Sequence, residues 1–241
     1  DRKTFGDDHP RVATGRNNLA LLLQDLGDPP AARVLFEQAL ASNRKTFDDD
    51  HPTVATTRGN LASLLRELGD RPTARVLFEQ ALASNRKTFG DDHPEVATDR
   101  SNLALLLHQL GDRPAARVLF EQALASDRKT YGDDHPRVAT HRNNLASLLR
   151  DLGDLPAARV LLEQALASDR KTYGDNHPAV ARGRNNLALL LRDLGELPAA
   201  RVLLEQALTS FIAAYGNDHP TVAKVRASLA ALIEQTGPVL P

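Results

Sequence analysis

The chain has 241 residues, of which 41% are hydrophobic and 25% charged, so it can bury a core and is not compositionally disordered. Lys and Arg number 30 against 31 Asp and Glu, and the resulting net charge of −1 argues against a nucleic-acid partner held by bulk charge. The absence of cysteine excludes disulfides, thiolate metal sites and cysteine nucleophiles.

No apolar run approaches the roughly 18 residues of a membrane span, and the start of the sequence has no signal-peptide pattern. We therefore expect a cytoplasmic protein with no membrane partner. Methionine is absent, which predicts that the chain is a piece of a longer intracellular protein.

The dipeptide His-Pro recurs with a constant period of 42 residues along the chain. Almost every position has a counterpart one period away, and no linker or change in composition interrupts the pattern. Repeats of this length indicate stacked supersecondary units rather than separate domains. We therefore expect residues 1–241 to form a single repeat array. The dipeptides begin at His9, His51, His93, His135, His177 and His219.

Each period reads as two helices. Pro10 suits the first position of a helix, Gly27-Asp28 ends that helix, and a second helix starts at Pro30 and closes near Lys45. Apolar residues recur on one face of both helices, which predicts mutual burial. We expect helix pairs starting near residues 10, 52, 94, 136 and 178, an unpaired last helix over 220–235, and in residues 1–5 the remnant of a truncated helix.

The segments NNLALLLQDLGDPPAARVLFEQAL (17–40) and NNLASLLRDLGDLPAARVLLEQAL (143–166) resemble the tetratricopeptide repeat, whose small residues match Ala20, Ala32 and Ala39. The 42-residue form is similar to the repeats of kinesin light chain and to repeats at the C-terminal ends of bacterial signalling ATPases. HEAT-type arrays share a period of roughly 40–47 residues but lack this glycine-aspartate turn and alanine triad. The resemblance implies an all-α, right-handed superhelical solenoid of helix-turn-helix repeats.

One core-facing position departs from the family, because an arginine stands where a large apolar residue is usual. A partly buried arginine needs a carboxylate. We expect a pair of the Arg16–Glu37 type inside each repeat; the alternative is a surface pair between Arg33 and Glu37, four residues apart. The arginines are Arg16, Arg58, Arg100, Arg142, Arg184 and Arg226.

Differences between the copies gather on one face of the first helix, next to a position that is asparagine in five copies. In the resembled family this face lines a concave groove, and the asparagine is similar to one that holds a ligand's backbone or carboxylate. An amide donates and accepts hydrogen bonds at once, as an extended peptide requires, and the arginines favour an acidic peptide. The candidate peptide-binding residues are Asn17, Asn18, Asn60, Asn102, Asn143, Asn144, Asn185, Asn186, Arg66, Arg150 and Arg192.

Other interpretations of this face stay open. The asparagines can instead bridge neighbouring helices, and the arginines can be a solvated surface. The groove is expected to end at Ser228, which replaces the asparagine of the sixth copy.

The sequence has no catalytic constellation, and the recurrent Asp-Asp-His-Pro indicates helix capping rather than a metal site. We therefore expect no enzyme, no metal and no cofactor. The favoured function is a non-enzymatic scaffold that binds an extended protein or peptide segment, as the sensor or interaction module of a larger protein. The alternatives are a structural array that self-associates through its open ends, and a duplicated or engineered array without a selected ligand.

Overall fold

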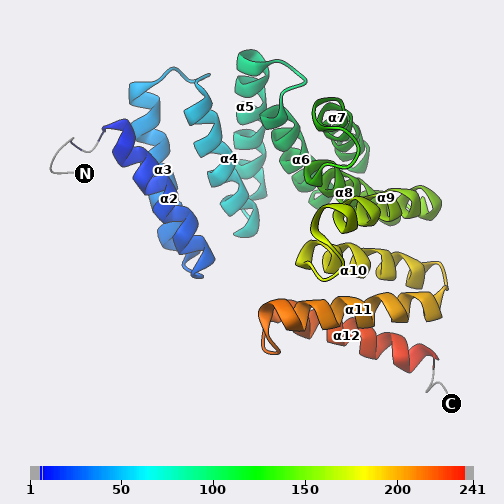
Figure 1. Ribbon diagram of the computed structural model, residues 1–241. Helices are drawn as coiled ribbons and strands as arrows, with labels where there is room; N and C mark the ends of the chain where they lie inside the picture. The colour runs from blue at the N-terminus through cyan, green and yellow to red at the C-terminus, as the bar shows by residue number, and fades with distance from the viewer. Residues whose placement is uncertain (1–5, 7, 237–241) are drawn as a thin grey trace. The chain divides into compact units, whose positions relative to one another are not determined.

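The computed structural model describes residue 6 and residues 8–236, and within them the regular structure is entirely α-helical (Figure 1). The predicted helix pairs and the all-α fold class are confirmed, while the expected remnant at residues 1–5 lies outside the described residues. The helices are α2 (Pro10–Asp25), α3 (Pro29–Thr46), α4 (Pro52–Glu67), α5 (Arg71–Phe89), α6 (Pro94–Gln109), α7 (Arg113–Tyr131), α8 (Pro136–Asp151), α9 (Leu155–Tyr173), α10 (Pro178–Asp193), α11 (Leu197–Tyr215) and α12 (Pro220–Thr236).

The histidine before each first helix caps that helix. His51 precedes α4 in extended conformation, and its Nδ1 accepts a hydrogen bond from the backbone N–H of Thr53 at 3.2 Å. The ring of Phe47 stacks on the His51 ring with centroids 4.1 Å apart. The same cap recurs at α2, α6, α8 and α10. The recurrent histidine thus satisfies an N–H that a helix start leaves without an intrahelical partner.

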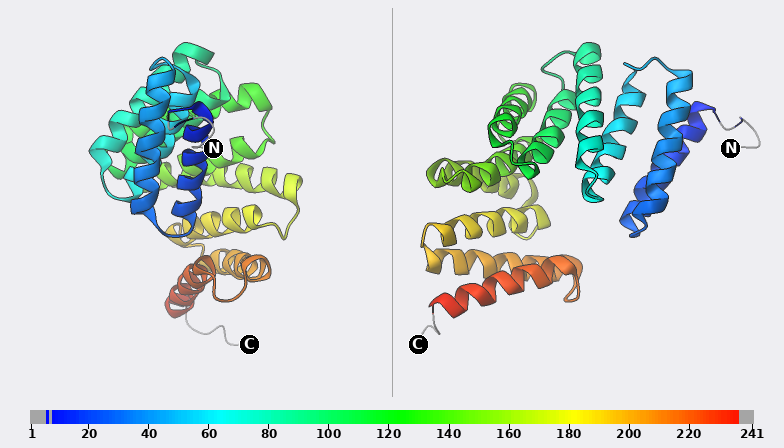
Figure 2. Two further views of the ribbon diagram at one scale, coloured as in Figure 1. Left: turned by 90° about the vertical axis from the view of Figure 1, so that its left-hand side faces the viewer. Right: turned by 180° about the vertical axis from the view of Figure 1, so that it is seen from behind.

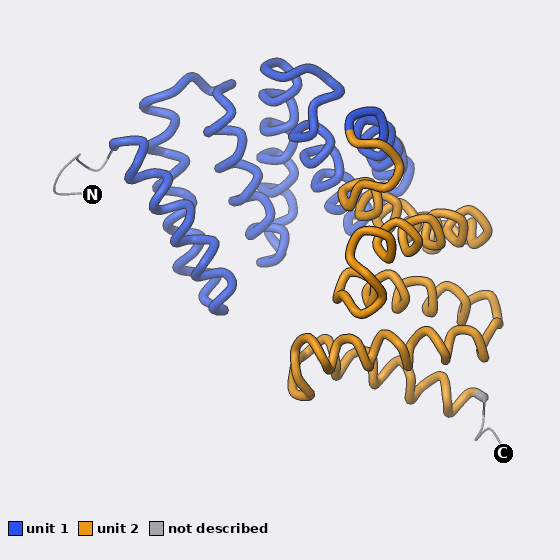
Figure 3. The backbone as a smooth tube through the Cα atoms, viewed as in Figure 1, with its two compact units in different colours: residues 1–130 blue, residues 131–241 orange. Residues whose placement is uncertain are grey.

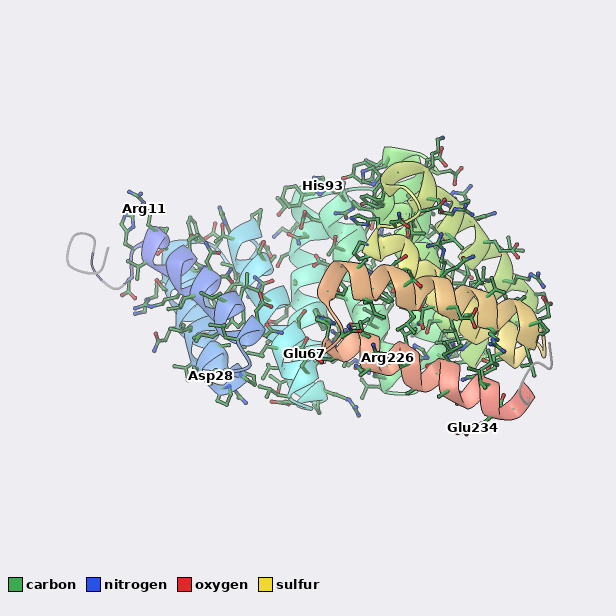
Figure 4. All side chains as sticks on the ribbon, turned by 60° about the horizontal axis from the view of Figure 1, so that its bottom comes forward. Arg11, Asp28, Glu67, His93, Arg226 and Glu234 are labelled. Atoms are coloured by element: carbon green, nitrogen blue, oxygen red, sulfur yellow. The ribbon has the colours of Figure 1, made fainter. Side chains whose placement is uncertain are left out.

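The turn between α2 and α3 uses a glycine and an aspartate for different reasons. Gly27 has a φ of +82°, a left-handed conformation that favours glycine. Asp28 then accepts a hydrogen bond from the N–H of Ala31 at 3.1 Å, so α3 begins at Pro29 (Figure 4). The sequence predicted the start at Pro30, one residue late, because it did not assign the capping position to Asp28.

The chain forms two compact units, residues 1–130 and residues 131–241 (Figure 3). In the first unit α2 packs on α3, α3 on α4, α4 on α5 and α5 on α6. In the second unit each helix from α8 to α12 packs on the next along the chain (Figure 2). Each unit is therefore a run of stacked hairpins. A single array over 1–241 stays a prediction.

Small and large side chains alternate in the core of each unit. Ala20, Ala32 and Ala39 are completely buried and let the backbones of paired helices approach closely. Phe36 is also completely buried, and Leu162 takes the corresponding position in the second unit. Burial of such side chains against neighbouring repeats supplies most of the stability of a hairpin too short to fold alone. No helix in the described part of the chain combines the length and the apolar character that crossing a membrane requires.

The recurrent arginine is buried in the four middle copies, partly buried at Arg16 and exposed at Arg226, and its predicted partner is wrong. Arg58 donates from Nη1 to the carbonyl of Asp49 at 2.6 Å and from Nη2 to the Asp49 carboxylate at 3.0 Å. Glu37, the type of residue expected to receive it, instead pairs on the surface with Arg33 at 2.7 Å. The arginine side chain reaches back to the loop before its own helix and fastens that loop. The same bond recurs between Arg100 and Asp91, Arg142 and Asp133, and Arg184 and Asp175.

Candidate peptide-binding surface

The predicted site residues all lie on the first helices of the repeats. In the second unit Asn143, Asn144 and Asn186 line a hollow of about 330 Å³ where α8 and α10 adjoin. A second hollow of about 200 Å³ has the same three asparagines and Arg150 in its wall. Four predicted residues therefore meet at one place, whereas Asn185 and Arg192 line neither hollow.

The first unit has a hollow at the corresponding position. It measures about 350 Å³, and Asn17, Asn18, Asn43 and Thr57 contribute to its wall. Asn17 and Asn18 correspond in the repeat to Asn143 and Asn144 of the second unit. The predicted face is thus indented at equivalent places in both units.

Two predicted residues of the first unit lie away from this hollow. Arg66 is near the end of α4 and Asn102 is near the middle of α6, and both are partly buried. Neither contributes to the wall that Asn17 and Asn18 line. The structure therefore brings only some of the predicted residues together in each unit.

The asparagines also bridge neighbouring first helices. Asn60 donates from Nδ2 to Oδ1 of Asn17 at 3.0 Å, and Asn186 donates in the same way to Asn143 at 3.1 Å. Asn143 in turn donates to the carbonyl of Ala139 at 2.8 Å. The structural role that the sequence left open is therefore present at these two places. It does not exclude ligand contact, because an amide carries two donor hydrogens and an acceptor oxygen.

The arginines of this face are largely offset by carboxylates. Arg150 lies 3.5 Å from Asp193, and Arg192 lies 3.1 Å from the same carboxylate. In the first unit Glu67, the counterpart of Asp193, accepts a hydrogen bond at 2.6 Å from Gln24, the counterpart of Arg150. Each such acid ties its helix to the preceding first helix. These acids were not predicted from the sequence, although their recurrence next to the predicted arginine position was a usable signal.

Two further positions, fourteen residues apart, were also missed, and they lie buried at the junctions between repeats. Asn43 donates to the hydroxyl of Thr57 at 3.0 Å. At the next junction Asn85 donates to the carboxylate of Asp99 at 2.7 Å, and burial raises the pKa of Asp99 to about 6. Both positions carry different residue types in different copies, while the residues around them stay nearly the same. This variation was the signal in the sequence.

The junction between α9 and α10 holds a different pair at these positions, Asp169 and Gly183, and both line the 330 Å³ hollow. Asp169 is only 7% exposed. Burial raises the pKa of its carboxyl, while the charges of Arg182 and His177 act in the opposite direction. The carboxyl group of Asp169 therefore lies in the same hollow as the predicted asparagines.

The sequence profile of the tetratricopeptide repeat matches residues 1–45, 11–87, 53–129, 100–171 and 137–213. These matches span most of the chain, and the paired helices with buried alanines agree with them. The chain belongs to the tetratricopeptide repeat family. No curated protein matches the chain.

Solved structures define the type of repeat. The nearly identical TPR-like repeats of a candidate kinesin light chain from Podosopora anserina are 29% identical, with a TM-score of 0.71 over 86% of this chain and 98% of that one. BtubC (BKLC) from P. vanneervenii is 26% identical, with a TM-score of 0.72 over 88% of this chain and 84% of that one. The repeats are thus of the kinesin light chain-like type.

A thermophilic TPR protein from Thermus thermophilus shares the fold at 22% identity. Its TM-score is 0.63 over 92% of this chain and 99% of that one.

Proposed function

We propose that the chain is a non-enzymatic scaffold that binds an extended segment of a partner protein along the first-helix face of its repeats. The observation that carries this proposal is the asparagine-lined hollow at equivalent positions in both units. Tetratricopeptide repeats are generally protein-interaction scaffolds, so the family supports the same class of function.

The affinity must come from several repeats acting together. A single amide hydrogen bond contributes about 1 kcal/mol net. An extended peptide advances about 3.3 Å per residue, while packed helices lie about 8–10 Å apart. One asparagine per repeat can therefore meet about every third peptide residue. A preference for acidic peptides stays a prediction that the pairing of Arg150 and Arg192 with Asp193 weakens.

Selection from a displayed library of random peptides tests this function. We expect captured peptides to bind at least tenfold more weakly to Asn144→Ala, because this substitution removes one of the three amides that line the hollow, with its donors and its acceptor. Gln164→Ala, an exposed change on the second helix α9, is the matched control and should leave binding unchanged. Failure to select any peptide, or equal binding by both variants, contradicts the proposal.

A second candidate function, self-association through an end of the array, is favoured by the apolar face of α2. Leu22 is 52% exposed, whereas its counterpart Leu64 on α4 is completely buried. Sedimentation velocity over a range of concentrations tests this candidate. Concentration-dependent association that Leu22→Glu abolishes would support it, and a monomer at every concentration would contradict it.

A further inference from the structure

We propose that the hollow beside Asp169 is a subsite for one cationic side chain of the bound peptide, an ammonium or a guanidinium group. This inference rests on the proposed peptide-binding function and adds a chemical specificity to it. It concerns the second unit alone, where α8, α9 and α10 supply all the residues of the hollow.

Asp169 lacks the partner that two of its counterparts have. At two other junctions the equivalent side chains bond to the residue fourteen positions later, Asn43 to Thr57 and Asn85 to Asp99. At this junction the later residue is Gly183, which has no side chain to offer. Among the described residues no group donates a hydrogen bond to the Asp169 carboxylate. Asp169 is only 7% exposed, so its carboxylate is a buried acceptor that a group of a bound ligand can satisfy.

The size of the hollow favours an organic group. Its volume is about 330 Å³, which leaves room for several atoms. A bare metal ion would be far too small to fill it, and no cluster of three or more metal-binding side chains occurs in the described part of the chain. The volume suits the end of a lysine or arginine side chain.

The electrostatics of the wall favour a cation. A buried carboxylate without a partner is costly, and a cation inside the hollow relieves that cost. Asp169 faces Arg182 and His177 from the α10 side and Tyr173 on its own helix, whereas α8 contributes the uncharged Thr140 and Asn143. Arg182 is exposed to solvent and therefore screens Asp169 incompletely.

Amide groups near the Asp169 carboxylate offer further hydrogen-bond acceptors. Asn143, Asn144 and Asn186 contribute amides to the same wall, and an ammonium group donates three hydrogen bonds. A cation bound to Asp169 can therefore also find neutral acceptors. The peptide backbone would lie against the asparagines while the side chain points toward the carboxylate.

The experiment is a titration of the whole chain followed by NMR of the backbone amides. The probe is Nα-acetyl-lysine methylamide, and its neutral control is Nα-acetyl-norleucine methylamide, which has the same shape without the ammonium. We expect a saturable shift of amides near Asp169 and Gly183 with the lysine probe and none with the norleucine probe. Raising the pH should strengthen binding, because the carboxylate form of Asp169 binds the cation.

Two variants make the experiment decisive. Asp169→Asn removes the charge, and Gly183→Thr places at this junction the residue that Thr57 supplies at another. A Cβ at residue 183 would lie 3.2 Å from the flexible end of Leu166, and Thr57 shows that a threonine is accommodated there. We expect both variants to fold and to bind the lysine probe at least tenfold more weakly.

A response that persists in Asp169→Asn, an equal response to the norleucine probe, or no saturable response at all would overturn the subsite. Any of these results, obtained while the peptide library still selects Asn144-dependent binders, removes the subsite and leaves the proposed function standing. Failure of the library selection removes the function itself.

Discussion

The junctions at Asn85–Asp99 and Asp169–Gly183 use the same two backbone positions for different purposes. In the first unit a buried amide donates a hydrogen bond to a buried carboxyl at 2.7 Å. In the second unit the carboxyl moves to the other position, and its partner is reduced to a glycine beside a hollow. Two differences in sequence thus separate a closed junction, where the two side chains are hydrogen-bonded, from an open junction, where the carboxyl lines a hollow.

The largest expected effect is at the closed junction. Burial raises the pKa of Asp99 from 3.8 to about 6, with the nearby charge of Glu95 adding to the rise, while the hydrogen bond from Asn85 opposes it. The folded state therefore holds the proton more tightly than the unfolded state does. The stability that Asp99 contributes is complete when it is protonated in both states and is lost as the pH rises through about 6.

Asp99→Asn should remove this loss. The rise of the Asp99 pKa from 3.8 to about 6 corresponds to about 3 kcal/mol, so the variant should be up to that much more stable at pH 8 and show little difference near pH 4. Denaturant unfolding at several pH values measures this. Asp92→Asn, an exposed change in the preceding loop, is the control, and an equal gain in both variants would contradict the assignment.

Asn85→Ala should have the next largest effect, because it leaves the Asp99 carboxylate buried without its donor. We expect a loss of about 2 kcal/mol at pH 7, measured by denaturant unfolding. The control is Asn43→Ala, which removes only the neutral bond to Thr57 and should cost about 1 kcal/mol. A larger loss of stability for Asn43→Ala than for Asn85→Ala would contradict this prediction.

The comparison can also be reversed by transplanting the open junction into the first unit. Asn43→Asp combined with Thr57→Gly recreates the pair of Asp169 and Gly183 next to Asn17 and the equivalent hollow. We expect a second saturable set of shifts with the lysine probe, at amides near residues 43 and 57. The affinity of the new site for the lysine probe should lie within tenfold of that of the Asp169 site. No response in a folded double variant would show that these two residues alone do not create the subsite.

Gly183→Ala should have the smallest effect on stability. Alanine favours a helix interior over glycine by about 1 kcal/mol, but the new Cβ would lie 3.2 Å from Leu166. We expect a gain below 1 kcal/mol in thermal or denaturant unfolding. Gly59→Ala, where a Cβ meets open space, is the reference and should gain more.

The sequence predicted the helix pairs closely because His-Pro, Gly-Asp and the alanine triad act locally and recur in every copy. It predicted that Arg58 is buried but not its partner, since a helical projection gives the face of a side chain and not the direction in which a long chain extends. Asp49 lies on a loop outside that projection.

The candidate site was predicted in part. Asn143, Asn144, Asn186 and Arg150 meet at the hollows because they share a helix face. Asp169 was missed because it lies near the end of the second helix, among charged residues that resemble a solvated surface. Its burial depends on the packing of α9 against α10, which no single helix reveals.

The junction pairs also limit how such a chain can gain or lose whole repeats during evolution. Excision of residues 44–85 would bring Asn43 opposite Asp99, which recreates a pair already present at the junction of Asn85. Excision of residues 170–211 would instead set the Asp169 carboxylate against Val225, an apolar residue of α12. Loss of one repeat is therefore expected to cost less stability at the first place than at the second, although the copies are nearly the same.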